Sequence, residues 1–221
     1  MREARHLGIL MLDTRFPRPL GDIGHAESFE FPVRYATVIG ATPMRVVQGG
    51  AQGLLQPFVD AARQLVDEGA AAIATSCGFL ALFQRELARA LPVPVWTSSL
   101  LKLNELRAPG VITVDAAALG PEHLRAAGAD PGVPVVGLAA DSHLQRALLH
   151  DEPTFDPALA EADTVAAARE LTTRYPHVHE IVFECTNLPP YADAVMRATG
   201  RPVHHIVSLL HERWRALEAQ A

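Results

Sequence analysis

The feature that most constrains the fold is an internal repeat in which an apolar run ends in an aspartate. "GILMLD" at residues 8–13 matches "GVITVD" at residues 110–115. In each half a later apolar run ends in one of the two cysteines, Cys77 and Cys185, and an apolar run opened by proline follows each cysteine at the same distance. Landmarks repeated in this order predict two similar halves related by a pseudo-twofold axis.

Short runs rich in Val and Ile alternate with longer segments of helical periodicity, which is typical of βα units and parallel sheets. The predicted fold class is therefore α/β, with two similar parallel-sheet halves, residues 1–105 and 106–221, and an active site in the cleft between them. The last helix is free to pack back on the first half. The predicted strands are 7–12, 44–48, 70–75, 93–96, 110–115, 134–138, 179–184 and 202–206. The predicted helices are 54–69, 79–91, 121–129, 156–175 and 189–200.

Charge and hydropathy indicate what the chain binds. The formal net charge is −6, and Lys and Arg are scattered rather than gathered in a basic stripe, which disfavours nucleic acid. The first apolar run is interrupted at Asp13, too early for a signal peptide or a membrane span. We expect a cytoplasmic protein whose partner is a small anionic molecule, a carboxylate, and the sequence leaves homo-oligomerisation open.

The two cysteines lie where a predicted strand passes into a helix, and in doubly wound folds ligands bind at this end of the strands. The positive end of a helix dipole and free backbone N–H groups lower a thiol pKa from about 8.5 and favour the thiolate. A thiolate on one wall of a cleft and a thiol on the other supply the base and the acid that invert a stereocentre. For either cysteine alone, inert burial is the alternative.

Polar residues beside the cysteines and at the ends of the repeated runs could hold a carboxylate or its enediolate. Gly78 would let ligand oxygens approach the backbone. For Asp13 and Asp115, turn formation and helix capping are an equally good explanation. The predicted substrate-binding residues are Thr14, Thr75, Ser76, Gly78, Asp115, Thr186 and Asn187.

"TSCGF" and "ECTN", with "LDTRFP" after the first strand, resemble motifs of the cofactor-independent aspartate/glutamate racemase superfamily, over essentially the whole chain. That superfamily also contains hydantoin racemases, maleate isomerases and arylmalonate decarboxylases. The resemblance implies that Cys77 and Cys185 are a proton-transfer pair, that Asp13 is the carboxylate that helps one thiol lose its proton, and that no cofactor takes part.

The chain also departs from the superfamily motifs. The superfamily's usual Cys-Asn-Thr is replaced by Cys77-Gly78-Phe79 in this chain. Asn187 stands where amino-acid racemases often carry His or Glu. We therefore predict a cofactor-independent isomerase, a racemase of an amino acid or hydantoin-like carboxylate. The alternatives are an arylmalonate-type decarboxylase, a maleate-type isomerase, or a catalytically silent ligand-binding homologue.

The segment 13–35 has little periodicity and could close over the cleft, with Arg15 or Arg18 pairing a second substrate carboxylate. A solvated surface loop is the equal alternative. The histidines, ten in all, include no spacing of a recognised metal site, so no metal is predicted.

Overall fold

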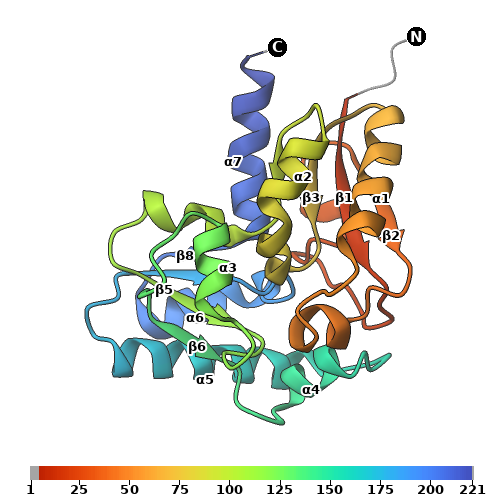
Figure 1. Cartoon of the computed structure of the whole chain (residues 1–221). Coiled ribbons are helices and arrows are strands. Elements are labelled where there is room, and N and C mark those ends of the chain that lie inside the picture. The colour runs from red at the N-terminus through yellow and green to blue at the C-terminus, as the bar shows by residue number, and fades with distance from the viewer. Residues whose placement is uncertain (1–4, 221) are drawn as a thin grey trace.

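The computed structural model describes residues 5–220, which form two four-stranded sheets of the same topology (Figure 1). The strand order is β2-β1-β3-β4 in the first sheet and β6-β5-β7-β8 in the second, and every pairing is parallel. The predicted α/β class with two similar parallel-sheet halves is confirmed. The strands are β1 (His6–Leu12), β2 (Val33–Val38), β3 (Ala70–Thr75), β4 (Val95–Trp96), β5 (Pro109–Thr113), β6 (Val135–Gly137), β7 (Glu180–Phe183) and β8 (Val203–His204).

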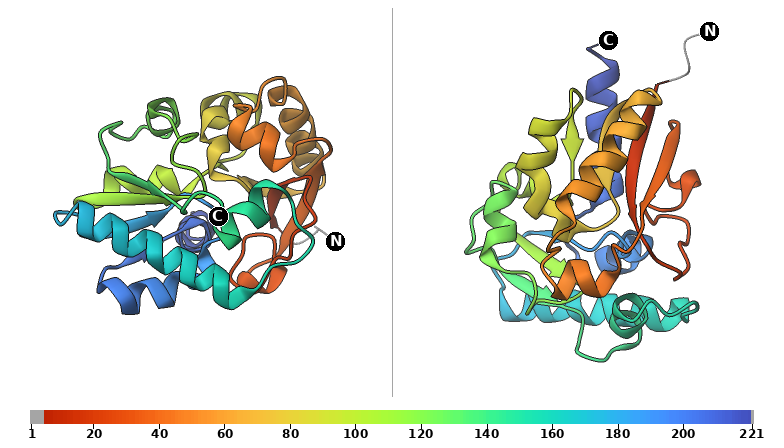
Figure 2. Two further views of the ribbon diagram at one scale, coloured as in Figure 1. Left: turned by 90° about the horizontal axis from the view of Figure 1, so that it is seen from below. Right: turned by 45° about the vertical axis from the view of Figure 1, so that its right-hand side comes forward.

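Helices cover the sheets because their apolar residues recur at helical spacing. α1 (Leu55–Asp67) buries Phe58, Ala62 and Leu65 in the core of the first half. α5 lies along the second sheet, and α4 continues toward the first half (Figure 2). The other helices are α2 (Gln84–Ala90), α3 (Pro121–Ala126), α4 (His143–Leu149), α5 (Pro157–Arg174), α6 (Ala192–Thr199) and α7 (Ile206–Glu218). The short helical turns are η1 (Ala26–Ser28), η2 (Met44–Gln48), η3 (Gly78–Phe83), η4 (Ser99–Glu105) and η5 (Pro189–Tyr191).

The last helix, α7, belongs to the second half by sequence but stands against the first sheet (Figure 1). Ile206, Leu210 and Trp214 are buried in one cluster with Leu7 and Ile9 of β1. Residues at positions i, i+4 and i+8 lie on one face of a helix, so α7 presents an apolar stripe to this sheet. Helix α7 therefore covers one face of the first sheet and links the second half of the chain to the first.

Truncating the α7 anchor should destabilise the whole fold. Trp214 is 3% exposed, so Trp214→Ala should lower the free energy of unfolding by about 3–5 kcal/mol. The matched control is Arg215→Ala on the same helix, whose side chain is 70% exposed and which should change stability by no more than about 0.5 kcal/mol. Urea unfolding followed by circular dichroism measures both, and equal losses would contradict the docking of α7.

The predicted strand at 44–48 is wrong, and a different strand takes its place in the sheet. Residues 44–48 form the π-helical turn η2, which buries Val46 and Val47 in the core. The edge strand is β2, which pairs along the whole of β1. Its residues are mostly partly or fully exposed, so β2 lacks the apolar run that identifies a buried strand.

Two further differences concern the second half. The predicted strand 202–206 is shortened to β8 because His205 caps α7, its Nδ1 accepting from the Ser208 N–H at 3.2 Å. Helix α4 was not predicted, yet it contributes Leu148 and Leu149 to the cavity described next.

Candidate active site

A cavity lies where the two halves meet at the carboxyl ends of their central strands. Cys77 follows β3 and Cys185 follows β7, and both thiols line it as free cysteines that are 9% and 7% exposed. The repeat therefore brings the two cysteines together as predicted. The residues around the cavity are Leu12, Phe16, Pro43, Val47, Ser76, Cys77, Gly78, Phe79, Val114, Leu148, Leu149, Glu184, Cys185, Thr186 and Asn187.

The two cysteine turns are tied to each other by hydrogen bonds. Thr186 Oγ1 donates to the Ser76 carbonyl at 2.6 Å, which joins "TSC" of one half to "ECT" of the other. Ser76 Oγ in turn accepts from the Leu12 N–H at 2.9 Å. Thr75 does not line the cavity, because its hydroxyl donates to the Thr97 carbonyl at 2.6 Å and to that of Cys77 at 3.1 Å. The Thr186 bond holds the two cysteine turns together.

The prediction that both thiols have lowered pKa values is wrong. Burial and, second to it, the Glu184 carboxylate raise the pKa of Cys77 to about 12, and the backbone N–H groups of Phe79 and Leu80 only partly oppose them. Burial, followed by Glu184, also raises the pKa of Cys185 well above its ordinary value. The donors expected at the strand ends exist, but desolvation of the sulfur outweighs them.

Glu184 is the residue that the sequence analysis missed. It is fully buried beside Cys185, and Thr113 Oγ1 of β5 donates to its Oε2 at 2.6 Å. Among the described residues, no group forms a hydrogen bond with Oε1. Burial raises the pKa of Glu184 to about 8, against the opposing effect of the Thr113 hydrogen bond. The available signal was a charged residue at the end of the otherwise apolar run "IVFEC".

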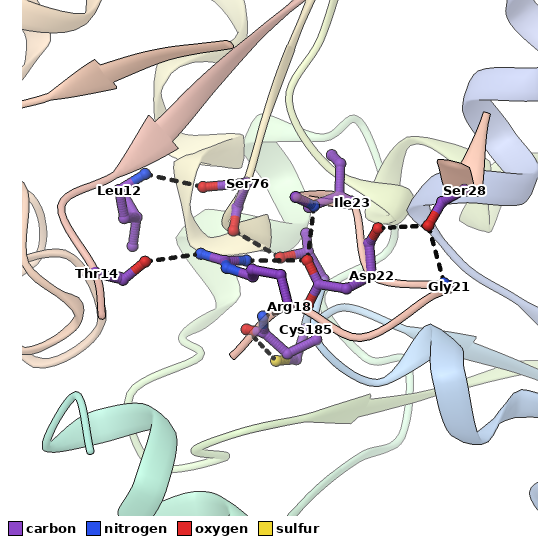
Figure 3. A network of polar contacts seen from close by, with 12 residues as sticks. Leu12, Thr14, Arg18, Gly21, Asp22, Ile23, Ser28, Ser76 and Cys185 are labelled. Carbon is purple, nitrogen blue, oxygen red and sulfur yellow. Dashed lines mark hydrogen bonds and ion pairs between the residues drawn. The ribbon is translucent and has the colours of Figure 1, made fainter. Parts of the chain in front are cut away.

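A buried polar network reaches Cys185 from the loop that follows β1 (Figure 3). Asp22 is fully buried and accepts from Arg18 Nη1 at 3.2 Å and from Asn187 Nδ2 at 2.7 Å. Asn187 Oδ1 then faces Cys185 Sγ at 3.7 Å. Asp22 thus orients the amide of Asn187 so that its oxygen points to the thiol.

Besides Thr75, three more of the predicted site residues do not line the cavity. Asp13 Oδ2 accepts from the Gly40 N–H at 2.9 Å, Thr14 Oγ1 accepts from Arg18 Nη2 at 3.0 Å, and Asp115 Oδ1 accepts from the N–H of Ala117 at 3.0 Å. The Asp115 contact is the turn-forming one weighed as the alternative, whereas the Asp13 contact joins the segments that follow β1 and β2. A catalytic role for Asp13 and substrate contacts for Thr14 and Asp115 stay predictions.

The loop after β1 closes onto the second half through Asp151. The Asp151 carboxylate accepts from the backbone N–H groups of Arg15 at 2.5 Å and Phe16 at 3.2 Å, and from Arg15 Nε at 3.0 Å. The Phe16 ring lines the cavity, and the Arg18 guanidinium lies 4.4 Å from its centroid. Both arginines named as candidate partners of a substrate carboxylate are therefore already paired with aspartates.

Within residues 5–220, no group of three His, Cys, Asp or Glu side chains is arranged to hold a metal ion. Over the same residues, the helices are all too short or too polar to cross a membrane.

Comparison with curated proteins decides the family. The chain is 32% identical over 216 residues to a dimethylsulfoniopropionate lyase of Durusdinium sp. clade D, an alignment that covers 91% of this chain and 71% of the relative. The chain belongs to this family of lyases. It is also 34% identical to dimethylsulfoniopropionate lyase 7 of Emiliania huxleyi, with 91% of this chain but only 64% of that relative covered. No family model matches the chain.

Solved structures show the same fold as this lyase-family chain. A mutant of arylmalonate decarboxylase with bound sulfate superimposes with a TM-score of 0.64 at 19% identity, over 98% of this chain and 94% of that one. A glutamate racemase from Bacillus anthracis superimposes with a TM-score of 0.65 at 14% identity, over 100% of this chain and 84% of that one. The resemblance to the aspartate/glutamate racemase superfamily is confirmed at the level of the fold. The predicted isomerase class is not confirmed, because the curated relatives are lyases.

Proposed function

We propose that the protein is a lyase that cleaves dimethylsulfoniopropionate, or a small carboxylate with the same β-sulfonium group, by removing the α-proton. The observation that carries this proposal is the pair of buried thiols in one cavity, in a chain whose family is named for this cleavage. A β-elimination was not among the reactions considered from the sequence, but it begins with the same proton transfer as racemisation.

The elimination needs one base and no cofactor. A thiolate takes the proton from the carbon next to the carboxylate, and the electron pair of that C–H bond forms the new C=C bond. The bond between the β-carbon and the sulfonium sulfur breaks, and its electron pair leaves with dimethyl sulfide. The products are acrylate, dimethyl sulfide and a protonated thiol, which returns its proton to water before the next turnover.

Cys77 is the better placed base of the two thiols. Two backbone N–H groups, of Phe79 and Leu80, favour its thiolate, whereas Cys185 has one, of Asn187. The Cys185 thiol also donates toward Asn187 Oδ1, a contact that only the protonated form makes. The positive sulfonium group would lower the pKa of a neighbouring thiol, since an opposite charge favours the ionised form.

The cavity walls suit the two methyl groups of a dimethylsulfonium ion. Phe16, Leu148 and Leu149 are buried and contribute apolar surface to the lining of the cavity. A sulfonium cation is weakly hydrated and is attracted to the face of an aromatic ring. These apolar side chains therefore fit the methyl groups of the sulfonium ion.

Incubation with dimethylsulfoniopropionate should release dimethyl sulfide and acrylate in equal amounts, measured by headspace gas chromatography and by NMR. A control in which both cysteines are replaced by serine should release neither above the rate in buffer. Well-folded wild-type protein that releases no dimethyl sulfide would refute the proposed substrate.

Racemisation is the second candidate, because thiols from both halves line the cavity and could act on opposite faces of one carbon. Incubation of L- and D-amino acids, hydantoins and arylmalonates in heavy water separates the two. Exchange at the α-carbon with inversion, without release of a leaving group, would favour the racemase.

A further inference from the structure

Any carboxylate that enters the cavity meets no positive side chain there. The lining contains no Lys, Arg or His among the described residues. Arg18, the nearest candidate in the adjoining loop, has its Nη atoms bonded to Asp22 and Thr14. A carboxylate substrate must therefore rely on neutral hydrogen-bond donors.

Most side-chain donors of the cavity are already occupied. Thr186 Oγ1 donates to the Ser76 carbonyl, and Asn187 Nδ2 donates to Asp22. Glu184 Oε1 differs, because it is fully buried, belongs to a residue that lines the cavity, and lacks a hydrogen-bond partner among the described residues. A buried polar atom without a partner is destabilising, so a ligand that supplies the partner gains the energy of the missing hydrogen bond.

The space next to Gly78 is filled by Glu184. A Cβ on Gly78 would overlap with the Glu184 backbone oxygen and with Oε1, and would lie 2.8 Å from Cδ. The missing side chain of Gly78 therefore lets the carboxyl group of the second cysteine turn lie against the first turn.

We infer that Glu184 is the carboxylate-recognition residue of the cavity: its carboxyl group, in the neutral form, donates a hydrogen bond from Oε1 to a carboxylate oxygen of the substrate. Thr113 supports this form by donating to Oε2, which leaves Oε1 to carry the proton. Neutral Glu184 also removes the negative charge that opposes ionisation of both thiols. The inference deepens the proposed function and rests on it only in requiring a carboxylate ligand.

The pH dependence follows from the groups that face Glu184. These are the two thiols. The pKa of Cys77, in the turn after β3, is raised to about 12. The pKa of Cys185, in the same turn as Glu184, is raised well above its ordinary value. From β5 the hydroxyl of Thr113 donates to Glu184. Since burial raises the pKa of Glu184 to about 8, Glu184 is the group that loses its proton first as the pH rises.

Three further titratable groups, Arg18, Asp22 and His123, belong to the surrounding elements. Arg18 and Asp22 pair with each other and act on the thiols more weakly than Glu184 does. His123 on α3 contacts the Phe79 ring, and burial lowers its pKa. Carboxylate binding should therefore be strongest well below pH 8 and weaken as the pH rises through 8, because ionised Glu184 repels the ligand and lacks the donated proton.

The test measures the Kd of propionate, which stays ionised throughout, by ligand-observed NMR between pH 6.5 and 9.5. For the wild type, Kd should rise roughly 30-fold from pH 7 to pH 9.5, because binding requires the protonated form of one group whose pKa is about 8. Glu184→Gln keeps a donor at the same place without titrating, so its Kd should stay within about threefold of the wild-type value at pH 7 and should not change up to pH 9.5. Glu184→Met lacks the donor, and its Kd at pH 7 should be about tenfold higher or more.

The matched control is Glu180→Gln on the same strand. Glu180 accepts from the Arg107 N–H and from His204 and does not line the cavity, so this variant should keep the wild-type pH profile. Alkaline weakening that persists in Glu184→Gln would overturn the inference, as would wild-type propionate binding by Glu184→Met with a native circular dichroism spectrum. The test uses no turnover, so a protein that binds propionate as expected but releases no dimethyl sulfide would fail only the proposed function.

Discussion

Cys77→Ser should lower kcat/KM for elimination by about 1000-fold, the usual size of the loss when a general base is removed. Serine is nearly the same size as cysteine, but its hydroxyl is far less acidic than a thiol, so it cannot supply the base. The expected loss is larger than for Cys185→Ser, because dimethyl sulfide leaves as a neutral molecule and its departure needs no acid. Steady-state release of dimethyl sulfide measures both variants.

The ratio of the two losses separates the reactions. Racemisation requires both thiols, one on each face of the carbon, so the two substitutions would then abolish interconversion equally. If elimination uses Cys77 as the base, Cys77→Ser should lose clearly more activity than Cys185→Ser. A larger loss for Cys185→Ser than for Cys77→Ser would assign the base to Cys185. It would contradict the assignment of Cys185 as the protonated thiol, which rests on its contact with Asn187 Oδ1 at 3.7 Å.

Gly78→Ala should lower kcat/KM by about 100-fold and the free energy of unfolding by about 1–3 kcal/mol. The added methyl group overlaps with the Glu184 backbone oxygen as well as with its carboxyl group. The strand end cannot move away easily, since the Glu184 N–H donates to the Ile112 carbonyl at 2.8 Å. The displacement therefore falls on the two cysteine turns, where proton transfer depends on sub-ångström geometry.

Gly132→Ala is the matched control for this substitution. A Cβ there would meet only the Asp130 side chain, at 3.3 Å, so we expect stability and activity close to those of the wild type. Urea unfolding and initial rates on the same preparations measure both effects. Full activity of Gly78→Ala would show that the close approach of the two turns is not required.

Much of the fold could be predicted because it depends on local periodicity and on the repeat. Apolar runs of strand length between amphipathic helices define a parallel α/β fold whatever the tertiary contacts. The central strands of both halves, β1 and β3, β5 and β7, lie close to the predicted positions. The edge strand β2 did not follow from periodicity, because an exposed edge carries no apolar run and is identified by its pairing with β1.

The sequence by itself determined that Cys77 and Cys185 share one cavity, since the carboxyl ends of parallel strands in two repeated halves face each other. Only the tertiary structure decided their protonation, because burial raises both thiol pKa values and depends on every residue packed around them. It also decided that Glu184 fills the space beside Gly78, a contact between distant segments that leaves no local pattern. The positions of the strand ends follow from the local sequence, whereas the desolvation of side chains and their close contacts follow from tertiary packing.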